Sequence, residues 1–224
     1  MMKLLEIQNA SRIIKSGGNT FKLLNDISLQ VNEGEFISLM GPSGSGKSTL
    51  LNCIGMLDNF TDGEYLFLEK SIRNIKERER TKLYQEYIGF VFQAYHLIDE
   101  LTVKENIETP LLYKKINSSE RKALVADLLD RFNIVGKKDL FPPQLSGGQQ
   151  QLVGIARALV ASPKLILADE PTGNLNSKQS QEIMELFSQL NKEGVTIIQA
   201  THSEENASYG SRTVNLLDGQ IVNL

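Results

Sequence analysis

The stretch GPSGSGKST, residues 41–49, decides the fold because it matches the pattern G-x-x-x-x-G-K-[ST] of a phosphate-binding P-loop. In such a loop, glycines let backbone N–H groups turn toward phosphate oxygens, and the lysine adds a positive charge. The helix expected to begin near Lys47 adds the positive end of its dipole. We therefore predict that phosphates are bound by Gly41, Pro42, Ser43, Gly44, Ser45, Gly46, Lys47, Ser48 and Thr49. Ser48 would also bind Mg²⁺ on the same phosphates.

The residues on both sides of this loop support the interpretation. Residues 35–40 read as a short buried strand, and residues 49–54 continue as a helix. Strand, loop and helix therefore follow one another in the order of a P-loop unit. A flexible Gly/Ser surface turn, which is the alternative, does not predict these neighbours.

Composition narrows the class of protein. The chain has 224 residues, 41% of them hydrophobic, which suffices for one large domain or two small ones. A net charge of −3 gives no basic field, so we expect no nucleic-acid partner. The sequence has no run of 18 apolar residues and no signal-peptide pattern, so we expect neither a membrane span nor export. The single cysteine, Cys53, reads as a packed hydrophobe in a reducing compartment.

Alternating apolar and polar residues predict a β-rich first part of the chain. The expected strands cover residues 4–7, 27–31, 65–68 and 88–92, and the last one ends at Gln93. A turn is expected at residues 17–19. The charged segment 70–82 reads as a solvated helix.

The pattern becomes helical between residue 94 and about residue 145. Thr102 and Glu105 have the spacing of a capping box. One apolar stripe is expected from Leu124, Val125, Leu128, Leu129 and Phe132. We interpret this part as an inserted helical subdomain. An α/β pattern then returns, with a helix after Gly147, strands at 165–168 and 195–200 separated by a helix that ends at Gly194, and a hairpin at 213–222.

Two further motifs carry chemistry. LILADEP, residues 165–171, ends an apolar strand in two carboxylates, at the edge where an α/β sheet meets its ligand. Asp169 would hold Mg²⁺ through water and Glu170 would polarise an attacking water, unless both acids only cap the next element. LSGGQ, residues 145–149, begins a helix with Ser146, Gly147, Gly148 and Gln149 and so offers a second phosphate-binding helix terminus. Two chains could then share each nucleotide.

The P-loop, Gln93, LSGGQ, LADE and His202, in this order, resemble the ATP-binding-cassette (ABC) ATPases over essentially the whole chain. The resemblance implies an α/β fold: a P-loop NTPase core with a mixed sheet, an N-terminal antiparallel β layer and the helical subdomain at about 94–145, in a single domain 1–224. It also implies ATP and Mg²⁺ as cofactors and a head-to-tail dimer that closes over two ATP molecules. In this family pattern Ser48, Gln93 and Asp169 serve Mg²⁺, Glu170 is the base, and His202 contacts the γ-phosphate.

Residues 90–113 and 167–177 resemble, more closely, the branch that contains LolD, MacB and FtsE. This branch implies an ATPase bound to an FtsX-like permease at the inner face of the cell membrane. Candidate permease contacts are Tyr95, His96, Leu97 and Leu101, although ordinary packing between subdomains would explain them equally well.

Four positions depart from the family pattern: Ile14, Leu152, Asn176 and Ser203. Ile14 stands where an aromatic ring usually stacks on adenine; alternatively, Ile14 packs in the β layer and Phe21 or a partner residue supplies the stacking. The sequence thus predicts an ATPase subunit that drives a separate permease in lipoprotein release, macrolide or peptide efflux, or a similar process. A regulatory, FtsE-like ATPase that signals across the membrane without transport is the alternative. Repair and translation ATPases are disfavoured, because the chain has neither long heptad arms nor two cassettes.

Overall fold

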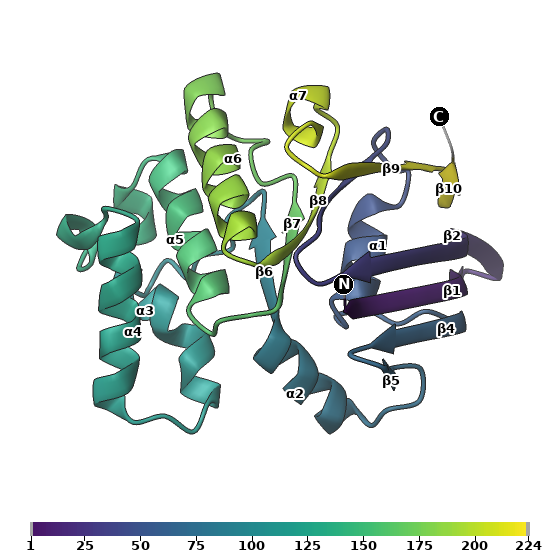
Figure 1. Cartoon of the computed structure of the whole chain (residues 1–224), viewed down its shortest axis with the longest axis horizontal. Coiled ribbons are helices and arrows are strands. Elements are labelled where there is room, and N and C mark those ends of the chain that lie inside the picture. The colour runs from purple at the N-terminus through teal and green to yellow at the C-terminus, as the bar shows by residue number, and fades with distance from the viewer. Residues whose placement is uncertain (1, 223–224) are drawn as a thin grey trace.

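The computed structural model describes residues 2–222 and contains two β-sheets, drawn together in Figure 1. The first is a four-stranded antiparallel sheet in the order β2-β1-β4-β5. Its strands are β1 (Lys3–Ser16), β2 (Asn19–Asn32), β4 (Asp62–Phe67) and β5 (Lys70–Ser71). This sheet is the N-terminal antiparallel layer that the sequence predicted.

The second sheet is mixed and has the strand order β10-β9-β3-β8-β7-β6. Its strands are β3 (Phe36–Met40), β6 (Ile88–Phe92), β7 (Leu165–Asp169), β8 (Thr196–Thr201), β9 (Arg212–Leu217) and β10 (Gln220–Val222). All neighbours are parallel except β9 and β10, which form the predicted C-terminal hairpin. The α/β class with a mixed sheet is therefore confirmed.

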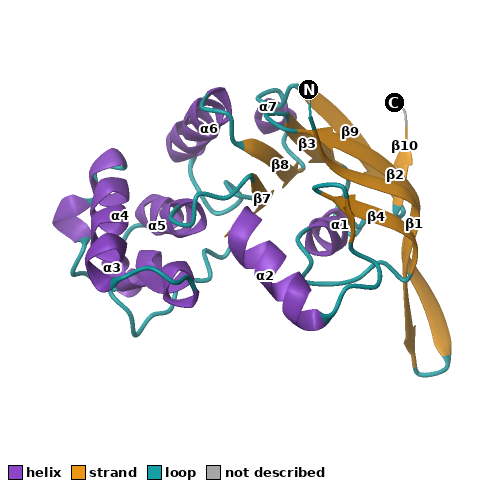
Figure 2. Cartoon of the chain, turned by 60° about the horizontal axis from the view of Figure 1, so that its bottom comes forward, coloured by secondary structure: helices purple, strands orange, loops and turns teal. Residues whose placement is uncertain are grey.

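Helices cover both faces of the mixed sheet. They are α1 (Lys47–Ile54), α2 (Glu77–Tyr87), α3 (Val103–Glu108), α4 (Ser118–Arg131), α5 (Gly147–Leu159), α6 (Ser177–Lys192) and α7 (Glu204–Ala207). Short 3₁₀ turns lie at Thr109–Tyr113, Val135–Lys137 and Pro142–Gln144. Figure 2 shows α1 between the antiparallel strands and the mixed sheet, while α3 and α4 lie at the opposite end of the molecule, beyond α5.

Successive residues of the parallel strands pack into two different hydrophobic cores, one on each face of the mixed sheet. Leu165 and Leu167 pack toward α1 and the antiparallel layer, whereas Ile166 and Ala168 pack toward helices α3 to α6. This two-residue period follows from strand geometry, and burial on both faces explains why the strand reads as a continuous apolar run. Cys53 packs as a small hydrophobic residue in the first core. Burial there raises the pKa of its thiol to about 12, so the thiol stays protonated at neutral pH.

Two sequence-based predictions of local structure were wrong. The charged segment 70–82 is not one helix, because Lys70 and Ser71 pair with β4 through a turn at Leu68 and Glu69, whose φ angles are 49° and 63°. The helix begins only at Glu77 and continues to Tyr87.

The second wrong prediction placed Leu124 in the buried apolar stripe of α4. Leu124 is 37% exposed, because its position in the helical turn lies outside the face that is buried. The Thr102 capping box is present as predicted, with the Thr102 N–H donating to Glu105 at 2.8 Å.

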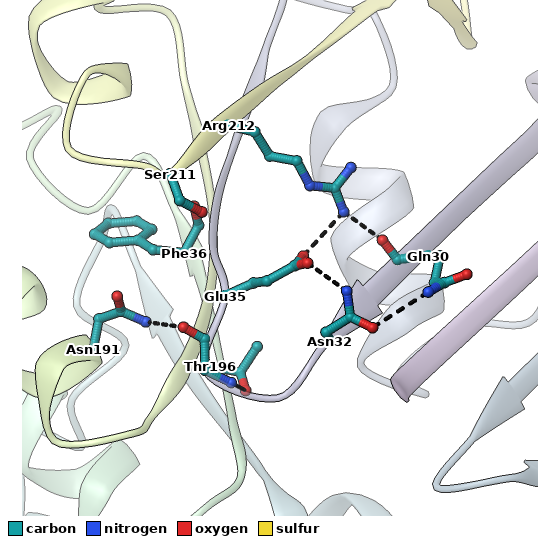
Figure 3. A network of polar contacts seen from close by, with 9 residues as sticks. Gln30, Asn32, Glu35, Phe36, Asn191, Thr196, Ser211 and Arg212 are labelled. Atoms are coloured by element: carbon teal, nitrogen blue, oxygen red, sulfur yellow. Dashed lines mark hydrogen bonds and ion pairs between the residues drawn. The ribbon is translucent and has the colours of Figure 1, made fainter. Parts of the chain in front are cut away.

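A polar network fixes the beginning of strand β3, as Figure 3 shows. Glu35 accepts hydrogen bonds from Asn32 at 2.6 Å and from Arg212 at 3.1 Å. The neighbouring Gly34 donates its N–H to Thr196 Oγ1 at 3.0 Å and accepts from Asn191 at 2.9 Å. The network therefore joins β3 to the beginnings of β8 and β9 and to the end of α6. It lies at the end of β3 opposite the loop of residues 41–49.

Candidate functional site

A cavity of about 900 Å³ lies where β3, β6, β7 and β8 end. The carboxyl ends of parallel strands are the usual ligand site of an open α/β sheet. The cavity is lined by Lys22, Leu23, Ser43, Gly44, Gly46, Lys47, Ser48, Thr49, Gln93, Glu170, His202, Asp218 and Gly219. Residues from the predicted P-loop, the Gln93 segment, the acidic strand end and the His202 segment therefore surround one space.

The loop of residues 41–49 leads from β3 directly into α1. Gly46 is the N-cap of α1 and has a φ of 104°, a conformation that favours glycine. Gly41 has no room for a side chain, since a Cβ there would lie 2.1 Å from the Leu216 carbonyl oxygen. The first backbone N–H groups of α1 thus remain free to bind an anion at the cavity.

Lys47 brings a positive charge to this loop. Its side chain is largely buried, and its Nζ donates to the Gly41 carbonyl at 2.7 Å and to the Pro42 carbonyl at 3.1 Å. Both acceptors are neutral, so the charge of the ammonium group is not neutralised by these contacts. The ammonium is therefore suited to bind a phosphate group in the cavity.

The end of β7 brings an acid next to a histidine. Glu170 Oε2 lies 3.0 Å from His202 Nδ1, and the Glu170 N–H donates to the Ala200 carbonyl at 3.0 Å. The Glu170 carboxylate is mostly buried, whereas the His202 side chain is 71% exposed. This pair can hold a water molecule and a terminal phosphate beside each other, which is what hydrolysis of a phosphoanhydride requires.

Asp169 places a buried carboxylate oxygen at the end of strand β7. Its Oδ1 is buried and has no hydrogen-bond partner among residues 2–222. Burial of such an oxygen is costly unless a donor or a cation compensates it. Asp169 ends β7 one residue before Glu170, so the chemistry of this oxygen fits a hydrated Mg²⁺ ion at the same strand end.

Gln93 follows β6 and is held by Asn174, a residue for which no role was predicted from the sequence. Its Nε2 donates to Asn174 Oδ1 at 3.2 Å, while Asn174 Nδ2 donates to the Gln93 carbonyl at 2.9 Å. A Cβ at Gly173 would lie 2.7 Å from Gln93 Nε2, so the glycine makes room for this amide. The backbone carbonyl oxygen of Gln93 accepts from Asn174, so the side-chain oxygen, Oε1, is the candidate for a metal ligand.

Ser146, Gly147, Gly148 and Gln149 do not line the cavity of their own chain. They form the first turn of α5, where the Ser146 N–H donates to Gln149 Oε1 at 3.1 Å and Ser146 Oγ accepts from the Gln149 N–H at 3.4 Å. The second predicted helix terminus therefore exists, but the structure does not bring it to the P-loop of the same chain.

Ile14 also lies apart from the lining of the cavity. It stands in the β1–β2 hairpin opposite Phe21, which is 48% exposed. The hairpin contributes Lys22 and Leu23 to the cavity instead. No motif in the sequence indicates that Lys22 and Leu23 belong to the site, because only the path of strand β2 brings them to the P-loop.

The C-terminal hairpin also contributes to the cavity, although the sequence predicted only the hairpin itself and no role for it in the site. Asp218 and Gly219 have φ values of 47° and 75°, as in a two-residue hairpin loop with left-handed residues. The Gly219 N–H donates to the Ser45 carbonyl at 2.9 Å, and its carbonyl accepts from Asn25 at 2.8 Å. The hairpin thus links the P-loop to strand β2.

The candidate permease contacts follow Gln93 in a turn with left-handed residues. Tyr95 and His96 have φ values of 59° and 48°, and Arg157 donates to both of their carbonyls. His96 lines a second cavity of about 540 Å³ between α2, β6, α5 and the turn at Thr109–Tyr113. Leu97 packs against the second core, and Leu101 is partly buried.

Comparisons with known proteins agree with this site. The family model for ABC transporters matches residues 24–173. The ABC transporter ATP-binding protein YvrO of Bacillus subtilis is 45% identical over 98% of this chain and 96% of its own length. The macrolide export ATP-binding/permease protein MacB of Wolinella succinogenes is 44% identical over 97% of this chain, which spans 34% of that relative.

A solved structure shows the same fold with products bound. The ATP-binding cassette MJ0796, in a dimeric post-hydrolysis state with ADP and Pi, is 40% identical and has a TM-score of 0.91 over 98% of this chain and 97% of its own. Within residues 2–222, no helix combines the length and the apolar character needed to cross a membrane. The chain belongs to the ABC transporter family, in a MacB- and LolD-like group, and is the ATPase that binds and hydrolyses ATP for such a transporter.

Proposed function

We propose that two copies of this subunit close head to tail over two ATP molecules and drive a separate FtsX-like permease. The observation that carries the proposal is the distribution of phosphate-binding helix ends. One, at Lys47, faces the cavity with Glu170 and His202, whereas the other, at Ser146, lies outside it. A second copy can bring its own Ser146 terminus to the open side of this cavity. The dimeric state of the MJ0796 cassette supports this arrangement.

In the proposed reaction, each cavity residue has one task. The N–H groups of residues 43–49 and the Lys47 ammonium bind the phosphates and compensate their charge. Glu170 accepts a proton from the attacking water, and His202 contacts the γ-phosphate while its Nδ1 stays close to Glu170 Oε2, 3.0 Å away in the structure.

Oxygen atoms of Ser48, Gln93 and Asp169 have no other task in the proposed reaction, and they are suitable ligands for Mg²⁺ or its water molecules. Ser48 and Gln93 line the cavity, and Asp169, which is not part of that lining, supplies a buried oxygen that has no hydrogen-bond partner within residues 2–222. When bound, Mg²⁺ would neutralise part of the phosphate charge. Ser48 would hold the ion directly, while Gln93 and Asp169 would orient it or its water ligands.

The second cavity is the proposed docking site of the permease. It is lined by aromatic and polar side chains, including Phe92, His96, Tyr113 and Arg157. Tyr113 is 71% exposed beside it, as an aromatic residue that anchors a partner often is. MacB relatives carry the words ATP-binding and permease in one name, which supports a permease as the partner of this ATPase. Docking would hold the subunit on the cytoplasmic face of the membrane.

Tyr113→Glu is expected to weaken binding to the permease by about tenfold or more, because the change removes an aromatic anchor and adds a charge. The basal ATPase rate of the isolated subunit should not change. Binding to a detergent-purified FtsX-like permease can be measured by biolayer interferometry. Leu57→Glu is the matched control, since Leu57 is also exposed but does not line this cavity. Equal loss of binding in both variants, or in neither, would contradict the proposed docking site.

Ile14 does not line the cavity, but it lies in the hairpin that contributes Lys22 and Leu23 to it. We propose that the longer side chain of Ile14→Tyr reaches the base and tightens ATP binding by about tenfold, because base–aromatic stacking is worth about 1–3 kcal/mol. The native protein should discriminate poorly between ATP and GTP, since few groups are placed to read the base. Calorimetric titration of both nucleotides measures both effects. Ile13→Tyr is the control, because adjacent strand residues point to opposite faces. If Ile14→Tyr leaves ATP affinity unchanged and Phe21→Ala lowers it, Phe21 rather than position 14 provides the stacking surface.

A further inference from the structure

Gln199 places a fully buried polar side chain in the centre of the mixed sheet. Its strand β8 otherwise has an apolar middle, and Gln199 is 0% exposed. Gln199 Nε2 donates to Ser38 Oγ at 2.9 Å and to the Asn206 carbonyl at 2.7 Å. Ser38 Oγ donates in turn to the Ala207 carbonyl at 2.9 Å. Since a buried amide needs such partners, this cluster ties helix α7 to strands β3 and β8.

Asn206 extends the cluster toward the active site. Its Nδ2 donates to Oγ1 of the buried Thr172 at 2.8 Å, and Thr172 lies two positions after Glu170. On the other side, the Asn206 N–H donates at 3.3 Å to the Oγ of Ser203, the N-cap of α7, which directly follows His202. Asn206 therefore connects the backbone next to Glu170 with the backbone next to His202.

The position of the His202 side chain depends on this backbone. The imidazole is 71% exposed, so the protein surrounds it only sparsely, and it meets Glu170 at 3.0 Å. A small shift of α7 relative to Thr172 would therefore change the distance between the imidazole and the carboxylate. Displacements of about 1 Å far from the reacting atoms can lower a rate by about 100-fold.

We propose that Asn206 is a positioning residue, which holds His202 and Glu170 in register through its hydrogen bond to Thr172. The proposal rests on the functions proposed above for Glu170 and His202. It requires no direct contact between Asn206 and ATP, and Asn206 does not line the cavity. Its effect should therefore fall on the rate of hydrolysis and not on nucleotide affinity.

Two variants of Asn206 separate positioning from general stability. Asn206→Leu removes the donor to Thr172, and we expect kcat for ATP to fall by about tenfold or more, with the KM and the ATP dissociation constant unchanged. Asn206→Asp should restore most of the rate, because the Thr172 hydroxyl can donate to a carboxylate. Thr172→Val removes the same bond from the other side with little change of volume, which keeps the test valid if Asn206→Leu does not fold.

The controls distinguish failure of this proposal from failure of the proposed function. Asn117→Leu removes the N-cap of α4, which accepts from Glu120 at 2.9 Å far from the cavity, and should lower the melting temperature without changing kcat. In a His202→Ala background, Asn206→Leu should cause no further loss of rate. If His202→Ala itself retains the native kcat, the assignment of His202 is wrong. If His202→Ala is slow but Asn206→Leu and Thr172→Val are as fast as the native protein, the positioning proposal alone is overturned.

Discussion

Lys47→Ala is expected to raise the dissociation constant for ATP by about 30-fold or more. Removing one partner of a hydrogen-bonded charge pair costs about 2–5 kcal/mol, and here the phosphates lose the ammonium group that lies within the P-loop. Gly41 and Pro42 also lose the donor that now meets their carbonyls at 2.7 and 3.1 Å. Titration with a fluorescent ATP analogue measures the change directly.

Lys22→Ala is the control for this measurement. Lys22 lines the same cavity but comes from strand β2, outside the P-loop, so its removal should weaken binding much less. Melting curves without nucleotide should show that both variants are folded. An unchanged affinity in Lys47→Ala, or an equal loss in the two variants, would contradict the role of Lys47.

Glu170→Gln is expected to bind ATP normally, to lower kcat by about 100-fold or more, and to accumulate as an ATP-bound dimer. The amide has the shape of the carboxylate and can still accept from His202, but it cannot take a proton from water. Without hydrolysis, the two cavities should remain closed over ATP. Size-exclusion chromatography with light scattering, with and without saturating ATP, measures the dimer.

A second substitution tests whether the Ser146 terminus completes the cavity of the other copy. Ser146→Arg, added to Glu170→Gln, places a long charged side chain at the start of α5 and should leave a monomer that still binds ATP. Conversely, a Glu170→Gln protein that binds ATP at saturation and yet stays monomeric would refute the shared site.

The parts of the fold that follow local rules could be predicted from the sequence. The buried strand Phe36–Met40, helix α1 and the hairpin of β9 and β10 were all expected from periodicity and turn residues. Strand β5 could not be expected, because Lys70 and Ser71 owe their extended form to pairing with β4 and not to their own preference. The same residues without that partner would suit the charged helix that the pattern indicated.

The candidate site also contains residues that could be predicted from the sequence and residues that could not. Glu170 and His202 belong to recognisable motifs, and the structure brings them to 3.0 Å. Their roles in catalysis remain predictions. Asn206 and Thr172 lie on different elements, and nothing in either segment indicates that the two side chains meet. Contacts of this kind depend on how α7 packs against the sheet, so they appear only in three dimensions.

The link between Gly219 and Ser45 has a consequence for synthesis of the protein. A ribosome makes residues 41–49 before residues 212–219, which place the Leu216 carbonyl close to Gly41 and donate the Gly219 N–H to the Ser45 carbonyl. During translation, therefore, the nascent chain carries an incomplete P-loop until residues 212–219 have left the exit tunnel. We therefore expect that ATP does not stabilise a chain that lacks these residues. We also expect nucleotide binding to begin only after residues 212–219 have folded beside the P-loop.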